Sequence, residues 1–166
     1  MASVRVPAFR SAGVRWAVCG VTLFVLAVDQ LSKSLVLAVR PGRRGGLLTV
    51  RLVRNTGASF GVGAGHPVLV MLVSAVLIAV VAVLLTRTAS KVAALFLAAV
   101  AGGALGNFAD RLFRSPGLGR GAVIDWIHLA WYSPSFNVAD IAVRAGAVGV
   151  VVVMLGTRAR QGVGRV

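Results

Sequence analysis

Two stretches of this chain, residues 68–85 and 92–109, each consist of eighteen consecutive uncharged and mostly apolar residues. An α-helix of that length extends about 27 Å at ~1.5 Å per residue, close to the ~30 Å thickness of a bilayer's hydrocarbon core. Of all residues, 58% are hydrophobic and 13% charged, which is outside the range of soluble globular proteins. The two runs therefore predict membrane-spanning helices.

Two further apolar runs contain charged residues. Residues 16–39 include Asp29 and Lys33, and residues 138–155 include Asp140 and Arg144. The basic N-terminus raises the alternative of a cleavable signal peptide, but the first run is too long for a signal core and ends without a small-residue cleavage site. We therefore expect four transmembrane helices in a single membrane-embedded domain spanning 1–166, with a basic cytoplasmic arm at 1–15 and a basic tail at 158–166.

Four spans place both termini on one side of the membrane and two long loops, residues 40–66 and 111–135, on the other. Each side carries eight Lys or Arg residues, so the orientation rests on the basic N-terminal flank, which favours cytoplasmic termini. The net charge of +14 raises the alternative of nucleic-acid binding. However, the arginines flank apolar runs, which indicates contact with lipid headgroups instead. Residues 47–53 alternate like a short strand. Residues 123–129, with Trp126 and His128 and followed by Trp131 and Tyr132, indicate an interfacial aromatic segment.

The chain has only four acidic residues, and its connectivity directs all of them to the loop side. Asp29 lies late in the first span, Asp110 ends the third, Asp125 is in the second loop, and Asp140 begins the fourth. Three amides, those of Asn55, Asn107 and Asn137, are directed to the same side. The i,i+4 spacing of Asp29 with Lys33, and of Asp140 with Arg144, permits an ion pair on each helix.

Structural roles compete with chemical ones at these positions. Asp29 with Lys33 fits a buried ion pair, the asparagines fit interhelical hydrogen bonds, and Asp140 fits a favourable charge at a helix N-terminus. On the chemical side, two carboxylates at a partly dehydrated site share a proton. Such a pair can activate water and protonate a leaving amine. The sequence has no Ser–His or Cys–His arrangement and no metal-ligand spacing, so we do not expect a metal site.

Five sequence blocks resemble the motif blocks of lipoprotein signal peptidase, also called signal peptidase II, in that family's order. They are DQLSK (29–33), RNTGASFG (54–61), GGALGNFADR (102–111), VIDWI (123–127) and FNVAD (136–140). Two positions depart from the family pattern, Ser59 in place of alanine and Trp126 in place of phenylalanine. We expect these two departures to affect selectivity and not the chemistry.

The resemblance implies an all-α integral membrane protein with four transmembrane helices, and a small β-cradle and short surface helix formed by the two extracytoplasmic loops. It implies an aspartyl endopeptidase of the bacterial cytoplasmic membrane that cuts prolipoproteins just before the diacylglyceryl-modified cysteine, with its active site at the outer face. The catalytic pair implied is Asp125 and Asp140, with no metal and no cofactor. Substrate-binding or supporting positions are Asn55, Gly57, Asn107, Asp110, Arg111, Asn137, Asp29 and Lys33.

The implied partners are the lipidated prolipoprotein and membrane lipid; we expect no nucleic-acid partner and a monomeric protein. Two other classes fit parts of the sequence. A proton-coupled transporter would use Asp29, Lys33, Asp140 and Arg144 as a relay, and a non-catalytic scaffold would use the glycines of 102–106 for packing. In the first loop, Gly57, Gly61, Gly63 and Gly65 indicate a segment that moves during substrate entry.

Overall fold

The computed structural model describes residues 8–41, 46–58 and 62–163. Its elements, in chain order, are the 3₁₀ helix η1 (Ala8–Arg10), α1 (Ala12–Val39), β1 (Leu48–Asn55), α2 (Pro67–Arg87), α3 (Lys91–Phe113), β2 (Val123–Leu129), β3 (Tyr132–Phe136) and α4 (Val138–Val163). The expectations for residues 1–7, residues 164–166, Ser59 and Gly61 concern positions outside the described residues.

The four spans expected from the sequence are confirmed. Helices α1, α2 and α3, together with Val138–Arg158 of α4, are each long and apolar enough to cross a membrane. Helix α2 is apolar around its whole circumference, and side chains such as Leu69, Leu72 and Val76 remain exposed on its outer face. A helix of this kind suits a lipid environment, so the chain is a multi-pass membrane protein.

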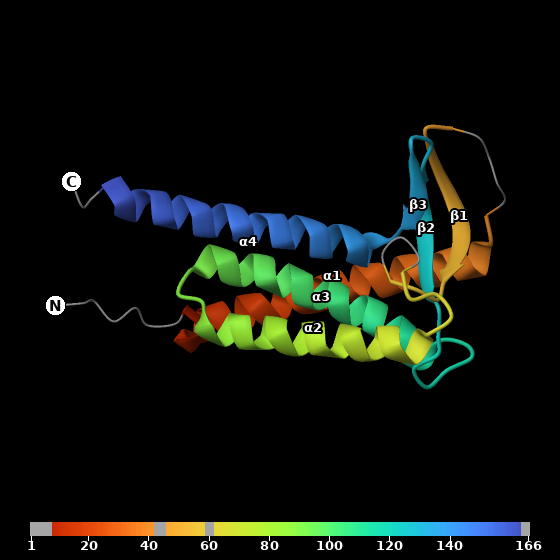
Figure 1. The fold of residues 1–166 in the computed structure, drawn as a ribbon, viewed down its shortest axis with the longest axis horizontal. Coiled ribbons are helices and arrows are strands. Elements are labelled where there is room, and N and C mark those ends of the chain that lie inside the picture. The colour runs from red at the N-terminus through yellow and green to blue at the C-terminus, as the bar shows by residue number, and fades with distance from the viewer. Residues whose placement is uncertain (1–7, 42–45, 59–61, 164–166) are drawn as a thin grey trace.

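Helix α3 is the centre of the bundle, and each of the other three long helices packs against it (Figure 1). Glycines permit the close approach that was expected of them. A side chain at Gly102 would collide with the Thr22 carbonyl of α1, and one at Gly103 would collide with the Ala139 carbonyl of α4. Small residues therefore let α1 and α4 pack closely against the same stretch of α3.

The three strands form one antiparallel sheet in the order β1-β2-β3. It lies across the end of the bundle opposite η1 and the C-terminal end of α4 (Figure 1). The strand expected at 47–53 is β1. Residues 123–129, interpreted from the sequence as an interfacial aromatic segment, form the strand β2 between the other two strands; this strand was not predicted.

The short surface helix implied for the two loops is not found in their described residues, which form strands and turns. In the second loop the residues after α3 make a turn and then the β2–β3 hairpin, whose strands pair Ile127 with Phe136 and Leu129 with Tyr132. β2 carries Asp125 in register with Val53 of β1. The sheet thereby places a loop carboxylate at the end of the helical bundle where α4 begins.

Candidate active site

Asp125 lies on the middle strand and is only 2% exposed. Two amides donate hydrogen bonds to its carboxylate: Asn55 Nδ2 to Oδ2 at 3.0 Å and Asn137 Nδ2 to Oδ1 at 2.6 Å. Asn55 ends β1, and Asn137 joins β3 to α4. Both carboxylate oxygens are therefore held by neutral donors that come from two different elements.

Asp140 lies in the first turn of α4 and closes a reciprocal cap with Asn137. The Asn137 side-chain oxygen accepts from the Asp140 N–H at 2.9 Å, and Asp140 Oδ2 accepts from the Asn137 N–H at 3.3 Å. This arrangement satisfies backbone donors that a helix start leaves free. The other oxygen, Oδ1, accepts from Asn107 Nδ2 at 2.9 Å. Asp140 therefore caps its helix and also contacts the amide of α3.

The amide of Asn137 connects the two carboxylates, because its side chain binds Asp125 while its backbone N–H binds Asp140. Asn137 is fully buried, and its Nδ2 also donates to Asn107 Oδ1 at 3.2 Å. The structure thus brings together Asn55, Asn107, Asn137, Asp125 and Asp140, which the sequence placed on one side of the membrane.

The pKa of the Asp125 carboxyl is raised from its ordinary value of 3.8 to about 6. Burial is the main cause, and the negative charge of Asp140 adds to it. The hydrogen bonds from Asn55 and Asn137 and the positive charge of Lys33 act in the opposite direction. This combination is the one expected for two carboxylates at a partly dehydrated site.

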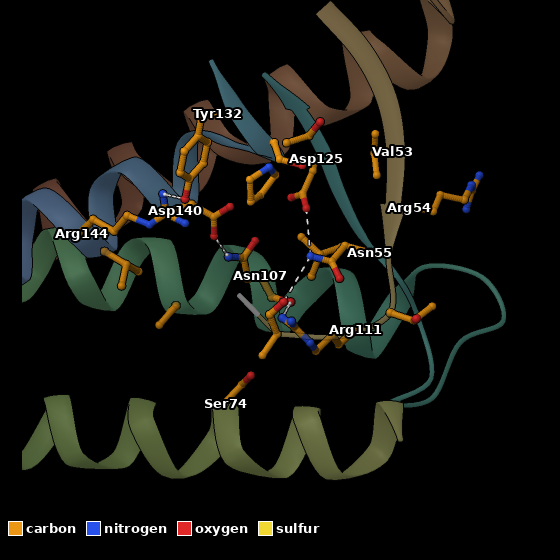
Figure 2. A pocket seen from close by; sticks show the side chains of 18 of the residues that line it. Val53, Arg54, Asn55, Ser74, Asn107, Arg111, Asp125, Tyr132, Asp140 and Arg144 are labelled. Carbon is orange, nitrogen blue, oxygen red and sulfur yellow. Dashed lines mark hydrogen bonds between the residues drawn. The ribbon is translucent and has the colours of Figure 1, made fainter. Parts of the chain in front are cut away.

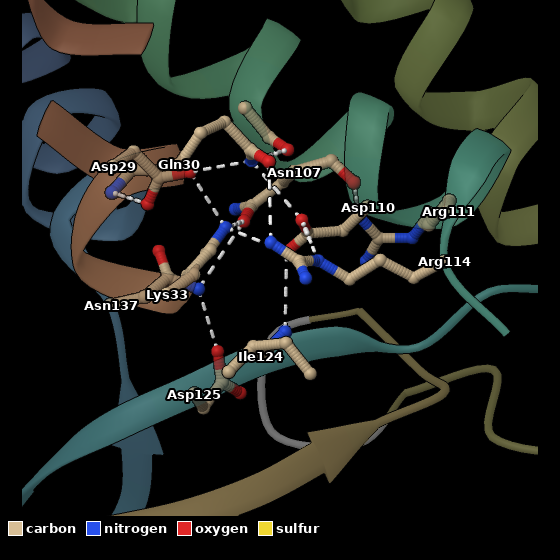
Figure 3. Close-up of polar contacts among 12 residues, drawn as sticks. Asp29, Gln30, Lys33, Asn107, Asp110, Arg111, Arg114, Ile124, Asp125 and Asn137 are labelled. Atoms are coloured by element: carbon tan, nitrogen blue, oxygen red, sulfur yellow. Dashed lines mark hydrogen bonds and ion pairs between the residues drawn. The ribbon is translucent and has the colours of Figure 1, made fainter. Parts of the chain in front are cut away.

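Beside this pair lies a buried ion cluster of Asp29, Lys33 and Asp110 (Figure 3). All three residues are 0% exposed, and Lys33 Nζ lies 2.7 Å from Asp29 Oδ2 and 2.8 Å from Asp110 Oδ2. The ion pair expected from the i,i+4 spacing of Asp29 and Lys33 is therefore confirmed. The third donor of Lys33 reaches Asn107 Oδ1 at 2.9 Å, which fixes the amide so that its nitrogen faces Asp140.

The buried ion cluster also holds the backbone next to each carboxylate of the pair. Asp29 Oδ1 accepts from the N–H of Ala139, the residue before Asp140, at 2.9 Å. Asp110 Oδ2 accepts from the N–H of Ile124, the residue before Asp125, at 3.2 Å. One lysine with two acids therefore connects α1 and α3 to the start of α4 and to β2.

Two residues of this region were not identified from the sequence. Gln30 Nε2 donates to the Gly106 carbonyl at 3.0 Å and to Asp110 Oδ1 at 3.1 Å. Arg114 Nε lies 2.6 Å from Asp110 Oδ1. The i,i+4 spacing of Asp110 and Arg114 was a usable signal, whereas nothing about Gln30 indicated its contact with α3.

Arg111 and Gly57 lie beside the pair and support the first loop. Arg111 is 7% exposed, and its guanidinium donates to the Gly57 carbonyl at 2.9 Å and to the Asn107 carbonyl at 3.0 Å. The Gly57 N–H donates in turn to Asn55 Oδ1 at 2.9 Å. Arg111 therefore fixes the turn that orients the Asn55 amide toward Asp125.

Asp125 and Asp140 both line a cavity of about 860 Å³ (Figure 2). Its wall comes from the sheet, from α3 and from α2 and α4, which are on opposite sides of α3. The side chains of Leu77 on α2, Ala104 on α3 and Val143 on α4 form an apolar part of this wall. The cavity therefore has a polar end at the carboxylates and an apolar part between helices.

The ion pair considered for Asp140 and Arg144 is not formed. Arg144 Nη1 instead donates to the Tyr132 hydroxyl at 3.3 Å, and its guanidinium carbon lies 6.0 Å from the centre of the Tyr132 ring. The two oxygens of Asp140 accept instead from Asn107 and from the Asn137 N–H. Tyr132 is a cavity residue that the sequence did not identify.

Within the described residues, no group of three or more His, Cys, Asp or Glu side chains is arranged to hold a metal ion. The histidines and the single cysteine lie outside the cavity wall. The groups that this site offers to a ligand are therefore carboxylates, amides, guanidinium groups and hydroxyls.

Comparisons with known proteins agree with one another. The family model described as "Signal peptidase (SPase) II" matches residues 21–156. A lipoprotein signal peptidase of Rhodococcus jostii is 44% identical over 137 residues, covering 79% of this chain and 68% of that protein. One of Mycobacterium avium is 36% identical over 136 residues, covering 79% and 74%. A solved bacterial membrane enzyme superposes with a TM-score of 0.75 at 22% identity, covering 86% of this chain and 90% of that one.

Proposed function

The chain belongs to the signal peptidase II family, and on that premise we propose that it is an aspartyl endopeptidase acting on diacylglyceryl-modified prolipoproteins. It removes the signal peptide by cutting just before the lipid-modified cysteine. The observation that carries the aspartyl mechanism is the pair of carboxylates at the polar end of one cavity, connected through Asn137.

The two carboxylates have different surroundings, which suggests different roles. Asp125 is the member whose pKa is raised to about 6, so it holds the proton of the pair. Asp140, in the ionised form, takes a proton from a water molecule as the water oxygen attacks the scissile carbonyl carbon. Asp125 then gives its proton to the cysteine nitrogen as the C–N bond breaks. The products are the carboxyl end of the signal peptide and the free amine of the lipidated cysteine.

The asparagines and Arg111 hold this arrangement in place. Asn55 and Asn137 donate to Asp125, and Asn107 donates to Asp140, so the carboxylates face the cavity with fixed orientation. Preorganised groups of this kind lower the reorganisation needed in the transition state. Arg111 acts through Gly57 and Asn55 and therefore belongs to the support of the site.

The substrate reaches the cavity from the lipid. Since α2 and α4 both line the cavity on opposite sides of α3, the acyl chains enter laterally between these helices and lie against Leu77 and Val143. The scissile bond then lies at the sheet end, near the outer interface of the bacterial cytoplasmic membrane, with both termini in the cytoplasm. The functional unit is a monomer.

The rival reading as a proton-coupled transporter places acids near the midplane of the membrane, facing a cavity open in turn to both sides. Asp29, Asp110 and Asp140 instead hydrogen-bond within one network, which also includes the sheet residue Asp125. This grouping at one end of the bundle favours a site reached from one side.

The test is cleavage of a diacylglyceryl-modified prolipoprotein by the purified protein, followed by the shift in substrate mass, with the unlipidated precursor as control. We expect cleavage of the lipidated form only, between the cysteine and the residue before it. Equal cleavage of both forms would remove lipid recognition from the proposal, and cleavage of neither would favour the transporter or scaffold readings.

A further inference from the structure

Arg144 is a charged residue of the cavity wall that the proposed mechanism does not use, and it comes from a helix. It lies one helical turn after Asp140, on a segment that crosses the membrane, and its side chain lines the cavity. A charged side chain within a membrane span is costly and is a functional hypothesis by default. Its sequence partner, Asp140, is engaged with Asn107 and Asn137, so the charge is not explained by an ion pair on the helix.

The guanidinium of Arg144 is held in position, but one hydrogen bond uses only part of its donor capacity. Tyr132 accepts one hydrogen bond of 3.3 Å and presents its ring at 6.0 Å. The Tyr132 ring in turn packs edge-to-face against Phe136, with ring centroids 6.0 Å apart. A guanidinium has five N–H donors in a planar fork, and within the described residues this single hydrogen bond uses one of them. The others are available to a group in the cavity.

The place of Arg144 defines the chemistry of its ligand. Its side chain extends from α4 to Tyr132 of β3 and lies beside Asp140 (Figure 2), in a cavity whose wall also includes the apolar side chains of Leu77, Ala104 and Val143. A ligand here has apolar chains on one side and hydrogen-bond acceptors on the other. Arg51, Arg54 and Arg111 also line this cavity, but Asp140 lies one helical turn from Arg144. Its carboxylate disfavours an anion beside the guanidinium, which favours a neutral acceptor over a phosphate.

We propose that Arg144 binds the ester carbonyl oxygens of the substrate's diacylglyceryl group. This inference rests on the proposed function, since the esters join the modified cysteine to its acyl chains. Arg144 then acts as a specificity residue: it recognises the linkage between glycerol and chains, while the apolar wall receives the chains. Tyr132 orients the fork, and neither residue takes part in the proton transfers.

The experiment compares two substrates that differ only in this linkage. One prolipoprotein peptide carries the diacylglyceryl group, and the other carries a dialkylglyceryl group of equal chain length, which replaces the ester carbonyls by ethers. For the wild type we expect KM for the diether to exceed KM for the diester by about tenfold, as for loss of a hydrogen bond to a charged donor. In Arg144→Gln the KM for the diester rises to the diether value, the diether is unaffected, and kcat stays within about twofold.

The matched control is Arg51→Gln, which removes the same charge from the β1 side of the cavity wall. We expect this variant to keep the diester preference of the wild type. Arg144→Lys, which keeps the charge and loses the fork, should show an intermediate preference. It also provides the comparison if Arg144→Gln does not fold, as judged by thermal unfolding.

Four outcomes would overturn the inference. If Arg144→Gln loses the same amount of activity on the diester and on the diether, Arg144 supports Asp140 or the fold and does not bind the esters. If the loss of activity varies with the anionic lipid content of the vesicles, and not with the linkage, Arg144 binds a phospholipid phosphate instead. If the wild type cleaves neither substrate, the proposed function itself fails; if it cleaves both equally well, only the role of Arg144 fails.

Discussion

The four acidic residues of this chain lie in one network, but they form two groups with different partners. In the buried ion cluster, Asp29 and Asp110 each contact Lys33 within 2.8 Å, and Asp110 also pairs with Arg114. The other two, Asp125 and Asp140, which we call the cavity carboxylates, are held by amide and backbone N–H groups. Within the described residues, neither cavity carboxylate forms a salt bridge.

This difference separates structure from chemistry. A carboxylate paired with a buried cation is costly to separate from its partner. A carboxylate held by neutral donors retains a proton equilibrium that its neighbour can shift, as the pKa of Asp125 illustrates. The buried ion cluster should therefore dominate stability, and the cavity carboxylates should dominate turnover.

The largest difference in effect between the two groups is expected when the charge of a cavity carboxylate is removed. Asp125→Asn or Asp140→Asn should lower kcat/KM for a lipidated substrate by about 10³-fold or more, because a proton donor or acceptor of the reaction is lost. The free energy of unfolding should fall by about 1–3 kcal/mol, since the new amide keeps one acceptor oxygen but turns its NH₂ group toward a neighbouring donor. Cleavage assays and thermal unfolding of the same preparations measure both quantities.

Substantial turnover by either variant would remove the assignment of that residue as catalytic. A large loss of stability in both variants would instead mean that the cavity carboxylates and the buried ion cluster do not differ in the way argued above.

The opposite pattern is expected for Lys33→Met. The methionine occupies similar space but leaves Asp29 and Asp110 without their shared cation, which should cost about 3–5 kcal/mol of stability. The matched control is Lys91→Met on the exposed first residue of α3, which should change stability by about 0.5 kcal/mol or less. Thermal unfolding in one detergent or lipid system compares the two, and similar unfolding temperatures would contradict a stabilising role for the cluster.

How far the sequence predicts each group follows from the kind of interaction involved. The helices follow from continuous apolar runs, and the Asp29–Lys33 ion pair follows from spacing within one helix; both are local signals. Chain direction alone then indicates that Asn107, Asp110 and Asp140 share one end of the bundle. These parts of the fold and site could be predicted because no pairing between distant segments had to be known.

The parts that could not be predicted depend on contacts between distant segments. β2 reads as an aromatic segment until β1 is paired with it, and Gln30 gives no sign of its contact with α3. Arg144 illustrates a competition: its spacing favours Asp140, but a helix cap and the Asn107 amide take the oxygens of that carboxylate. Tyr132, 12 residues earlier in the chain, becomes the partner instead.

The pH dependence of kcat/KM tests the role of Asp125 as the proton donor of the cavity carboxylates. Its pKa of about 6 in the folded chain means that the proton needed for the leaving amine is lost above that pH. kcat/KM should therefore fall above pH 6, approaching tenfold per pH unit. Because the folded pKa exceeds the ordinary 3.8, the contribution of Asp125 to stability is complete below about pH 4 and is lost as pH rises through about 6.

Asn55→Leu tests whether the fall of kcat/KM above pH 6 is caused by the titration of Asp125. The Asn55 amide favours the ionised form of Asp125, so its removal should raise the pKa and move the descending limb of kcat/KM to higher pH by about one unit. A limb that stays in place, or moves to lower pH, would assign the titration to another group.

The smallest effect is expected at the edge of the buried ion cluster, for Arg114→Gln. Arg114 pairs with Asp110 at 2.6 Å, but its side chain is 18% exposed and Asp110 keeps Lys33 and Gln30 as partners. Water can replace part of the lost contact, so the cost in stability should be about 1 kcal/mol, with kcat/KM within about twofold of the wild type. Thermal unfolding beside Lys33→Met measures the ratio of the two losses. If Arg114→Gln were as damaging as Lys33→Met, charge compensation in the cluster would depend on both cations equally. Lys33, the cation that contacts both Asp29 and Asp110, would then not be central to the cluster.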